Sequence, residues 1–327
     1  MPAIRTEALT KDYSTGFWRP RPSRALENLT LEIAPGEIFG FLGPNGAGKT
    51  TTLKLLMQLI FPTSGRAEIL GRPVGDVGVK RRLGYLPENP YFYDNLTAEE
   101  LLVYYARVFG HHGSEAARRA GELLDLVGIG GERALQLRKF SKGMLQRIGL
   151  AQALLNDPDV VFLDEPMSGL DPLGRRDVRE LILRLRERGC TVFFSSHILS
   201  DAESLCSRVA ILSAGRLIAT GTVSELLAFG VGGWELVMTN LAAATVARLG
   251  LRIARATEIA EGHYALELPI DAAPDGLLRE LTAAGAALVS LNPIRPTLED
   301  VFIKKVGGAR ERATFHHGAH RDHREKT

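Results

Sequence analysis

The stretch that decides the fold is Gly43-Pro44-Asn45-Gly46-Ala47-Gly48-Lys49-Thr50, which fits the pattern G-x-x-x-x-G-K-[ST] at every defined position. An apolar run at 38–42 precedes it, and a helical pattern follows at 51–60. Glycines let the backbone curl tightly enough to aim several N–H groups at one phosphate chain, and the N-terminus of the following helix adds partial positive charge. This order of strand, loop and helix predicts a binding site for a nucleoside triphosphate.

The residues of this loop have distinct expected tasks. The Lys49 ammonium is expected to reach the β- and γ-phosphates, and the Thr50 hydroxyl to bind Mg²⁺. Contacts to the phosphates are predicted for the rest of the loop and for the residue after it, namely Gly43, Pro44, Asn45, Gly46, Ala47, Gly48 and Thr51.

The bulk properties are those of a soluble globular protein. Of 327 residues, 45% are hydrophobic and 24% are charged, and the formal net charge of +2 gives no whole-chain reason to expect a nucleic-acid partner. Two cysteines provide no disulfide framework and favour a reducing cytosol. The N-terminus lacks the apolar core of a signal peptide, and no apolar run approaches the roughly 18 residues that span a bilayer. Any membrane role is therefore expected to come through a partner.

The first part of the chain, 1–222, predicts an α/β domain with a parallel sheet covered on both faces, because strands alternate with helices. Strands are expected at 3–9, 25–33, 38–42, 66–70, 83–86, 160–163, 191–195 and 209–212. The segment 14–24 is rich in Pro and Arg and predicts an exposed loop, since Pro20 and Pro22 exclude a central strand. A helical insertion is expected at about 91–155, with Thr97 and Glu100 spaced as a capping box at the start of its first helix.

A second domain is predicted at 231–306, after a glycine-rich boundary at 229–233. The expected order there is strand, helix, strand, strand, helix, strand, which is the ferredoxin-like α+β arrangement, followed by a closing helix at 296–306. The tail, 307–327, has almost no apolar residues and predicts disorder; its four histidines are expected to be solvated.

A pair of carboxylates, Asp164 and Glu165, follows the apolar run at 160–163. Open α/β sheets bind ligands at the carboxyl ends of their strands, where these two side chains are expected. Asp164 suits the coordination shell of Mg²⁺, and Glu165 suits the position that polarises an attacking water.

A second anion site is predicted where Ser141 and Gly143 begin a helix. The phosphate loop already supplies a full set of donors, so one triphosphate has no need of a second cradle in the same chain. The sequence therefore suggests that a neighbouring copy completes the site.

Residues 1 to about 222 resemble the ATP-binding subunit of an ABC transporter. Six elements in family order carry the resemblance: the phosphate loop, Leu86-Pro87-Glu88, Ser141-Lys142-Gly143-Met144, Leu163-Asp164-Glu165-Pro166, Ser168-Gly169-Leu170-Asp171 and His197. The resemblance implies a P-loop NTPase fold with a β subdomain and a helical insertion, ATP and Mg²⁺ as ligands, and ATP hydrolysis. It also implies a second ATP-binding subunit in a head-to-tail homodimer and a separate transmembrane permease, at the cytoplasmic face of the cell membrane.

The resemblance also implies roles for single residues. Tyr13 is expected to stack on adenine, with Phe17 and Trp18 as rivals for that role. Glu165 resembles the general base, and His197 resembles the histidine that contacts the γ-phosphate. Asp171 resembles the residue that communicates between the two sites of a dimer.

Two motifs depart from the family pattern. Glu88 stands where the family has Gln; either side chain offers an oxygen to Mg²⁺ or water, and the charge of Glu88 is expected to strengthen metal contact. Lys142 and Met144 replace Gly and Gln of the usual Leu-Ser-Gly-Gly-Gln signature. Lys142 either faces the γ-phosphate or is simply exposed.

A contact surface for the permease is expected at 89–96, where Pro90, Tyr91, Phe92 and Tyr93 cluster; the alternative is that these rings pack inward. The single ATP-binding unit, its signature and the end of the second domain resemble the ABC-2-type export branch that includes drug and polysaccharide exporters. The alternatives are a soluble ABC-type ATPase acting on ribosomes or DNA, which usually has two ATP modules or coiled-coil insertions, and a P-loop kinase, which has no need of Ser141 and Gly143.

Overall fold

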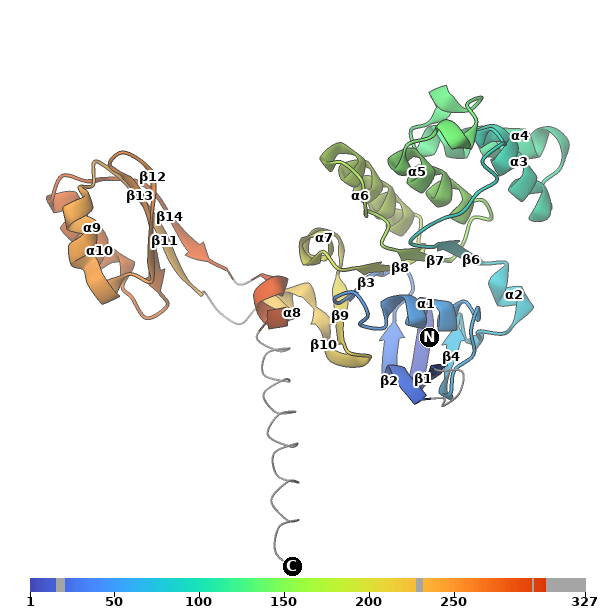
Figure 1. Ribbon diagram of the computed structural model, residues 1–327, viewed down its shortest axis with the longest axis horizontal. Coiled ribbons are helices and arrows are strands. Elements are labelled where there is room, and N and C mark those ends of the chain that lie inside the picture. The colour runs from blue at the N-terminus through green and yellow to red at the C-terminus, as the bar shows by residue number, and fades with distance from the viewer. Residues whose placement is uncertain (16–20, 228–231, 296, 304–327) are drawn as a thin grey trace, which may run out of the picture. The chain divides into compact units, whose positions relative to one another are not determined.

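The computed structural model describes residues 1–15, 21–227, 232–295 and 297–303 (Figure 1). These residues divide into two compact units with the boundary between Val223 and Ser224, and each unit is described by itself. Phe17, Trp18 and the tail at 307–327 lie outside the described residues, so the expectations for them stay predictions.

A six-stranded sheet in the order β10-β9-β3-β8-β7-β6 forms the centre of the first unit. Its strands are β3 (Ile38–Leu42), β6 (Leu83–Leu86), β7 (Val160–Asp164), β8 (Thr191–Ser196), β9 (Arg208–Ser213) and β10 (Arg216–Thr222). The neighbours from β9 to β6 pair in parallel, and β10 is antiparallel to β9. Every residue of β3, β7 and β8 is buried, as expected for a sheet covered on both faces.

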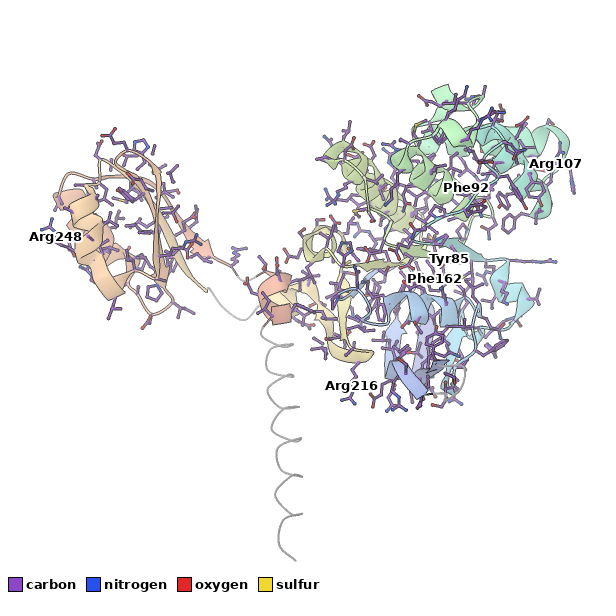
Figure 2. The ribbon with its side chains drawn as sticks, in the orientation of Figure 1. Tyr85, Phe92, Arg107, Phe162, Arg216 and Arg248 are labelled. Carbon is purple, nitrogen blue, oxygen red and sulfur yellow. The ribbon has the colours of Figure 1, made fainter. Side chains whose placement is uncertain are left out.

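A cluster of phenylalanines packs on one face of this sheet. The ring of Phe193 on β8 lies 5.1 Å from Phe41 and 5.8 Å from Phe39, both on β3, and 5.7 Å from Phe162 on β7, measured between ring centroids. Figure 2 labels Phe162 among the side chains of this core. Because alternate residues of a strand share a face, these rings stiffen the three strands that carry the candidate site at their ends.

An antiparallel sheet in the order β2-β1-β4-β5 is the second layer of this unit. Its strands are β1 (Ile4–Thr15), β2 (Arg21–Ile33), β4 (Ser64–Ile69) and β5 (Arg72–Pro73). Helix α1 (Lys49–Leu56) contacts β2 and β4 of this sheet and β7 of the parallel sheet (Figure 1). Its buried leucines, Leu53, Leu55 and Leu56, belong to the same core as the phenylalanines. The phosphate loop is therefore held between two sheets.

The described part of the first unit contains further helices. They are α2 (Val77–Lys80), α3 (Ala98–Val108), α4 (Gly113–Leu126), α5 (Lys142–Ala153), α6 (Pro172–Glu187) and α7 (Leu199–Leu205), with 3₁₀ turns at Gly130–Glu132 and Leu137–Lys139. Helix α6 contacts β8, α7 contacts β3 and β8, and α3, α4 and α5 contact one another. The capping box predicted for Thr97 and Glu100 is present at the start of α3.

Two predictions about this unit were wrong in detail, and one strand was missed. The expected loop at 14–24 is partly strand, because β1 and β2 pair as far as Thr15 with Arg21; β2 is an edge strand, where proline is tolerated. Strand β10 was not predicted. Helix α1 ends at Leu56 instead of residue 60, because Gln58 adopts a left-handed φ of 55° that stops the helix.

The second unit has a four-stranded antiparallel sheet in the order β12-β13-β11-β14. Its elements are β11 (Gly233–Thr239), α9 (Ala243–Leu249), β12 (Arg255–Ala260), β13 (His263–Pro269), α10 (Pro274–Ala283) and β14 (Ala287–Ile294). Leu236, Met238, Leu266, Leu277 and Leu281 form its core. The order of strands and helices is the predicted ferredoxin-like one. Strand β12 begins three residues later than expected, because Gly250–Arg252 forms a 3₁₀ turn.

Short helices flank this sheet in the chain. Helix α8 (Val223–Leu227) precedes it, and residues 298–303 are helical after it, where Thr297 and Asp300 cap the turn. The expected closing helix at 296–306 is thus seen in its described part. Within the described ranges, no helix has the length and apolar character needed to cross a bilayer.

A chain truncated after residue 229 is expected to bind ATP as tightly as the full chain. All residues that line the cavity at the phosphate loop belong to the first unit, which has its own core. Calorimetric titration with ATP checks this, with circular dichroism to verify the fold. Global unfolding of the truncated chain would contradict the division into two units.

Candidate functional site

The phosphate loop joins β3 to α1 and bounds an open cavity of about 350 Å³. The lining residues are Ala25, Pro44, Asn45, Gly46, Ala47, Gly48, Lys49, Thr50, Thr51, Glu88 and Glu165. Gly48 has a φ of 105°, and a Cβ there would lie 2.6 Å from the Ala25 carbonyl oxygen, so no other residue fits. The Lys49 ammonium is buried and donates to the Gly43 carbonyl oxygen at 2.7 Å. The loop is thus preformed, with its cation folded back onto its own backbone.

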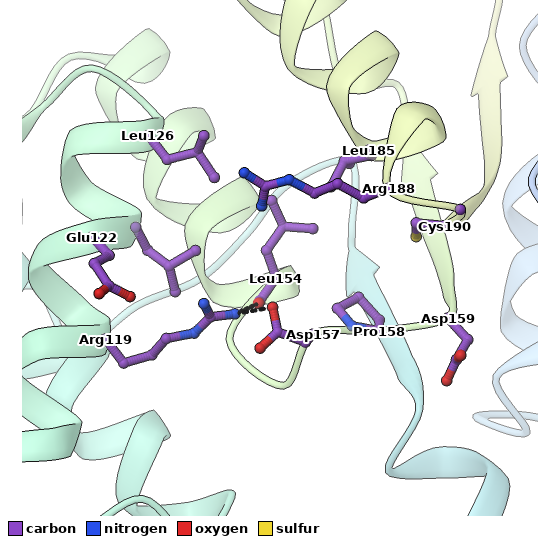
Figure 3. Close-up of a pocket in the computed structure, with 12 residues that line it drawn as sticks. Arg119, Glu122, Leu126, Leu154, Asp157, Pro158, Asp159, Leu185, Arg188 and Cys190 are labelled. Atoms are coloured by element: carbon purple, nitrogen blue, oxygen red, sulfur yellow. Dashed lines mark hydrogen bonds and ion pairs between the residues drawn. The ribbon is translucent and has the colours of Figure 1, made fainter.

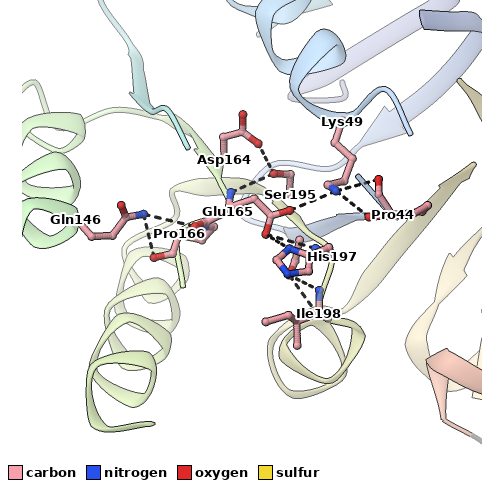
Figure 4. A network of polar contacts seen from close by, with 11 residues as sticks. Pro44, Lys49, Gln146, Asp164, Glu165, Pro166, Ser195, His197 and Ile198 are labelled. Atoms are coloured by element: carbon pink, nitrogen blue, oxygen red, sulfur yellow. Dashed lines mark hydrogen bonds and ion pairs between the residues drawn. The ribbon is translucent and has the colours of Figure 1, made fainter. Parts of the chain in front are cut away.

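The carboxyl ends of three parallel strands position Asp164 and Glu165, of which Glu165 lines this cavity. In register, Leu42 at the end of β3 pairs with Ser196 of β8, and Asp164 at the end of β7 pairs with Ser195. The Ser195 hydroxyl donates to Asp164 Oδ1 at 2.5 Å and accepts from the Glu165 backbone N–H at 3.1 Å (Figure 4). One serine therefore holds both the Asp164 carboxylate and the backbone of Glu165.

The Asp164 carboxylate has one oxygen that fits a metal ion. Its Oδ2 is buried and has no hydrogen-bond partner among the described residues. Burial raises the pKa of the Asp164 carboxyl above its usual value, while hydrogen bonds from Ser195 and Thr50 act in the opposite direction. A buried, unpaired carboxylate oxygen beside a threonine hydroxyl is the kind of donor set that Mg²⁺ prefers, so Asp164 and Thr50 fit the predicted metal.

The Glu165 carboxylate contacts two side chains, the Lys49 ammonium and the His197 imidazole (Figure 4). Its Oε1 lies 3.3 Å from Lys49 Nζ, and its Oε2 lies 2.8 Å from His197 Nδ1 and accepts from the His197 backbone N–H at 3.4 Å. The side chain of Glu165 is only 9% exposed, whereas that of His197 is 43% exposed. The structure thus joins the predicted base and the predicted phosphate-contacting histidine directly.

The second predicted cradle lies in a separate cavity of about 660 Å³. Ser141, Gly143 and Asp171 line it, and none of them lines the cavity at the phosphate loop. Ser141 caps α5 by accepting from the Met144 N–H at 3.3 Å, and Asp171 caps α6 by accepting from the Gly174 N–H at 2.6 Å. The two predicted parts of the site therefore line different cavities of one chain.

The remaining predicted residues are placed as follows. Glu88 is exposed at the edge of the phosphate-loop cavity. Tyr13 lies on β1 with 37% of its surface exposed and the Lys11 ammonium 5.3 Å from its ring centroid; it does not line that cavity, and its role stays a prediction. The exposed side chain of Lys142 lies against Gly169, where its Nζ would be 3.0 Å from a Cβ.

Two residues that the sequence did not single out belong to this site. Ser195 bridges Asp164 and Glu165, and the buried amide of Gln146 donates to the carbonyl oxygens of Glu165 and Pro166. Ser195 could have been found as a polar residue at the end of an apolar strand. Gln146 gives a weaker signal, because one glutamine in a helix is usually exposed.

A further cavity of about 480 Å³ lies elsewhere in the first unit (Figure 3). Arg119, Pro158, Asp159 and Cys190 are among its lining residues, and Arg119 is held there by the Leu154 carbonyl oxygen at 2.9 Å. Pro158 and Asp159 precede β7, so this cavity lies at the amino end of that strand. Ligands of open α/β sheets bind at the opposite ends of the strands, and no predicted site residue lines this cavity.

Comparisons with known proteins agree with this geometry. Residues 26–168 match the ABC transporter family, and residues 236–306 match the C-terminal domain of DrrA1-3-like ATP-binding proteins. An uncharacterised ABC transporter ATP-binding protein of Synechocystis is 46% identical over 305 residues, which cover 93% of this chain and 84% of the relative. A daunorubicin resistance ATP-binding protein of Streptomyces coeruleorubidus is 35% identical over 293 residues, which cover 88% of this chain and 92% of the relative.

A solved structure is also similar to the first unit. It is the dimer of an ATP-binding cassette in a post-hydrolysis state with ADP and Pi bound, and it is 26% identical. The TM-score is 0.62, and the match covers 67% of this chain and 98% of that one. From the phosphate loop, the carboxylates beside it and these relatives together, we conclude that the chain belongs to the ATP-binding subunits of ABC transporters, a family of ATPases.

Proposed function

We propose that this chain binds ATP with Mg²⁺ at the phosphate loop, that a second copy closes the site head to tail, and that hydrolysis then drives a separate membrane permease. The observation that carries the proposal is the separation of the two half-sites. Lys49, Thr50 and Glu165 line one cavity, whereas Ser141 and Gly143 line another. A two-fold pairing supplies each cavity at the phosphate loop with the missing half from the other copy, and it does so symmetrically.

The residues of the site divide the work of hydrolysis. Lys49 holds the β- and γ-phosphates, and Asp164 and Thr50 would hold Mg²⁺, which neutralises charge on the phosphates. Glu165 accepts a proton from the attacking water, and His197, bonded to the same carboxylate, contacts the γ-phosphate. Glu88 lines the edge of the cavity, and its carboxylate would offer a further oxygen to the metal or to its water. Stacking of Tyr13 on adenine and signalling through Asp171 remain part of the proposal.

Pairing of two copies is tested by light scattering of the purified Glu165→Gln variant with ATP. This variant keeps every phosphate contact but cannot accept the proton, so ATP is expected to hold it as a dimer. Without nucleotide, or with Lys49→Ala added, it is expected to remain a monomer. A Glu165→Gln chain that binds ATP but stays monomeric would contradict the proposal.

The surface proposed for the permease is an aromatic patch that begins in the segment 89–96. The rings there divide: Phe92, labelled in Figure 2, is 8% exposed, whereas Tyr91 is 94% and Tyr93 58% exposed. Tyr93 packs edge to face against Tyr104 of α3 at 6.4 Å between centroids, and Tyr104 is itself 49% exposed. Phe92 therefore packs inward, whereas Tyr91 and Tyr93 are exposed and remain available to a partner. Exposed aromatic rings on an anchored loop favour a protein partner.

Replacing Tyr91 and Tyr93 together by Ala is expected to abolish co-purification with the permease and to leave ATP hydrolysis by the isolated subunit unchanged. The two rings are exposed and do not line the phosphate-loop cavity. Affinity purification from membranes measures the first effect. Phe61→Ala, which removes another ring with 69% exposure, is the matched control. Normal permease recovery with the Tyr91 and Tyr93 variant would move the contact surface elsewhere.

Export from the cytoplasmic face of the membrane is proposed on the likeness to drug-resistance ATP-binding proteins. Affinity purification of the tagged chain from solubilised membranes tests it. Recovery of a polytopic membrane protein supports the transporter, whereas recovery of ribosomes or DNA would favour the soluble ATPase instead.

A further inference from the structure

Gln146 lies in the middle of α5 and is only 2% exposed. Its Nε2 donates to the Pro166 carbonyl oxygen at 3.1 Å and to the Glu165 carbonyl oxygen at 3.4 Å (Figure 4). The Gln146 side chain thus binds the backbone of Glu165, the predicted base, and of Pro166, the residue after it. Buried carbonyl oxygens need donors, and Gln146 provides one for both.

The backbone of Glu165 depends on such support. Its φ is 52°, in the left-handed region, which costs free energy for a residue with a side chain and persists only where surrounding contacts impose it. The Glu165 backbone N–H donates to the Ser195 hydroxyl at 3.1 Å, and the Glu165 carbonyl oxygen accepts from Gln146 Nε2. Together they set the direction in which the Glu165 carboxylate points.

Helix α5 connects Gln146 to Ser141, which lines the second cavity. Ser141 caps α5 and lies five residues before Gln146, which is roughly 7.5 Å along the helix axis. The next residue, Arg147, donates to Asp177 of α6 at 2.8 Å and so fastens α5 to its neighbour. A displacement of the N-terminus of α5 is therefore carried to Gln146, because a packed helix moves as a rigid element.

We propose that Gln146 is a positioning residue that couples the two ATP sites of the dimer. This inference rests on the proposed function, in which Ser141 of each copy contacts ATP held by the other copy. When Ser141 engages that ATP, α5 shifts, and Gln146 changes the orientation of Glu165 toward the ATP of its own chain. Occupancy of one site thereby sets the rate of hydrolysis at the other.

The test compares Gln146→Met with the wild-type chain. Methionine keeps the length of the side chain and removes the amide donor. The turnover number is expected to fall about 10-fold, and the Hill coefficient for ATP to fall from near 2, the number of sites, to near 1. ATP affinity of the monomer is expected to be unchanged, since Gln146 does not line the phosphate-loop cavity. Gln152→Met, which replaces another glutamine of α5, is the matched control.

A double-mutant cycle with Ser141→Ala separates coupling from a purely local role. If Gln146 transmits the engagement of Ser141, the double variant is no slower than the slower single variant. If the fold-reductions in turnover of the two single variants multiply in the double variant, the inference is overturned. An unchanged Hill coefficient in Gln146→Met would also overturn it. Thermal unfolding verifies the fold of each variant, and Gln146→Glu, which also lacks the amide donor, replaces the methionine variant if that one does not fold.

The proposed function and this inference can fail separately. A Glu165→Gln chain that binds ATP and stays monomeric contradicts the proposed function. If the wild-type chain dimerises and hydrolyses ATP cooperatively, and Gln146→Met shows the same cooperativity, only the coupling role of Gln146 is contradicted.

Discussion

Replacing Glu165 by Gln is expected to lower the rate of ATP hydrolysis by about 10²–10⁴-fold. The amide has nearly the same shape as the carboxylate but cannot take up a proton from the attacking water. The wild-type carboxylate lies 2.8 Å from His197 Nδ1 and 3.3 Å from Lys49 Nζ, so its position is held from both sides. Phosphate release under saturating ATP measures the effect.

The binding of ATP separates loss of chemistry from loss of structure in this variant. Glu165→Gln is expected to bind ATP with an affinity close to that of the wild-type chain. Glu187→Gln, at the exposed end of α6, serves as the control and is expected to hydrolyse ATP normally. Turnover of Glu165→Gln within a few-fold of the wild type would mean that another group is the base.

Lys49→Ala is expected to reduce ATP affinity by roughly 100-fold or more, because it removes a charged donor to two phosphates in a buried setting. The Lys49 side chain is 6% exposed, and its ammonium is already directed into the loop by the Gly43 carbonyl oxygen at 2.7 Å. Equilibrium binding of a fluorescent ATP analogue measures the loss.

Lys54→Ala is the matched control for this prediction. Lys54 is exposed in the last turn of the same helix, so its removal changes the charge of α1 but no phosphate contact. Tight ATP binding by Lys49→Ala would contradict the assignment of the phosphate loop, whatever the effect on hydrolysis.

The two variants also probe an ion pair inside the site. In this structure the Lys49 ammonium lies 3.3 Å from Glu165 Oε1, so the phosphate-binding cation and the predicted base neutralise each other. ATP competes for Lys49, and its binding would leave the Glu165 carboxylate with His197 as its remaining partner. We therefore expect ATP binding to separate the pair before hydrolysis.

Those parts of the fold that the sequence predicts well are set by local pattern. The continuous apolar runs of β3, β7 and β8 and the capping box of α3 identify their elements without help from the rest of the chain. Strand β10 was missed because it lies at the edge of the sheet with only one buried residue, Ala219, and shows no clear alternation. The hairpin of β1 and β2 was underestimated because an edge position makes proline acceptable, and the edge is known only from the fold.

The candidate site likewise has residues that the sequence predicts and residues that it does not. The phosphate loop, Asp164 and Glu165 are contiguous motifs whose residue types follow from the chemistry of phosphate and metal binding. Ser195 contacts Glu165 and Asp164, which lie 30 and 31 positions earlier in the chain. Gln146 contacts Glu165 and Pro166, which lie 19 and 20 positions later. Only the packing of β8 and α5 brings these residues together. In the aromatic segment, Phe92 points inward and Tyr91 outward, and a loop has no period from which this could be predicted.

Disulfide cross-linking tests most directly whether a second copy closes the site. Asn45, in the phosphate loop, and Lys142, beside Ser141, are both exposed and line separate cavities of one chain. Burial raises the pKa of the two native thiols, Cys190 and Cys206, so they stay protonated and do not compete. One sample therefore mixes an Asn45→Cys chain with a Lys142→Cys chain, both in the Glu165→Gln background.

Under mild oxidation, we expect a covalent dimer of the two different chains that forms with ATP and not without nucleotide. Each chain alone is expected to give little cross-linking, because the head-to-tail arrangement places Asn45 opposite Lys142 and not opposite Asn45. An ATP-bound mixture that forms no mixed dimer, or that links only identical chains, would contradict the composite site.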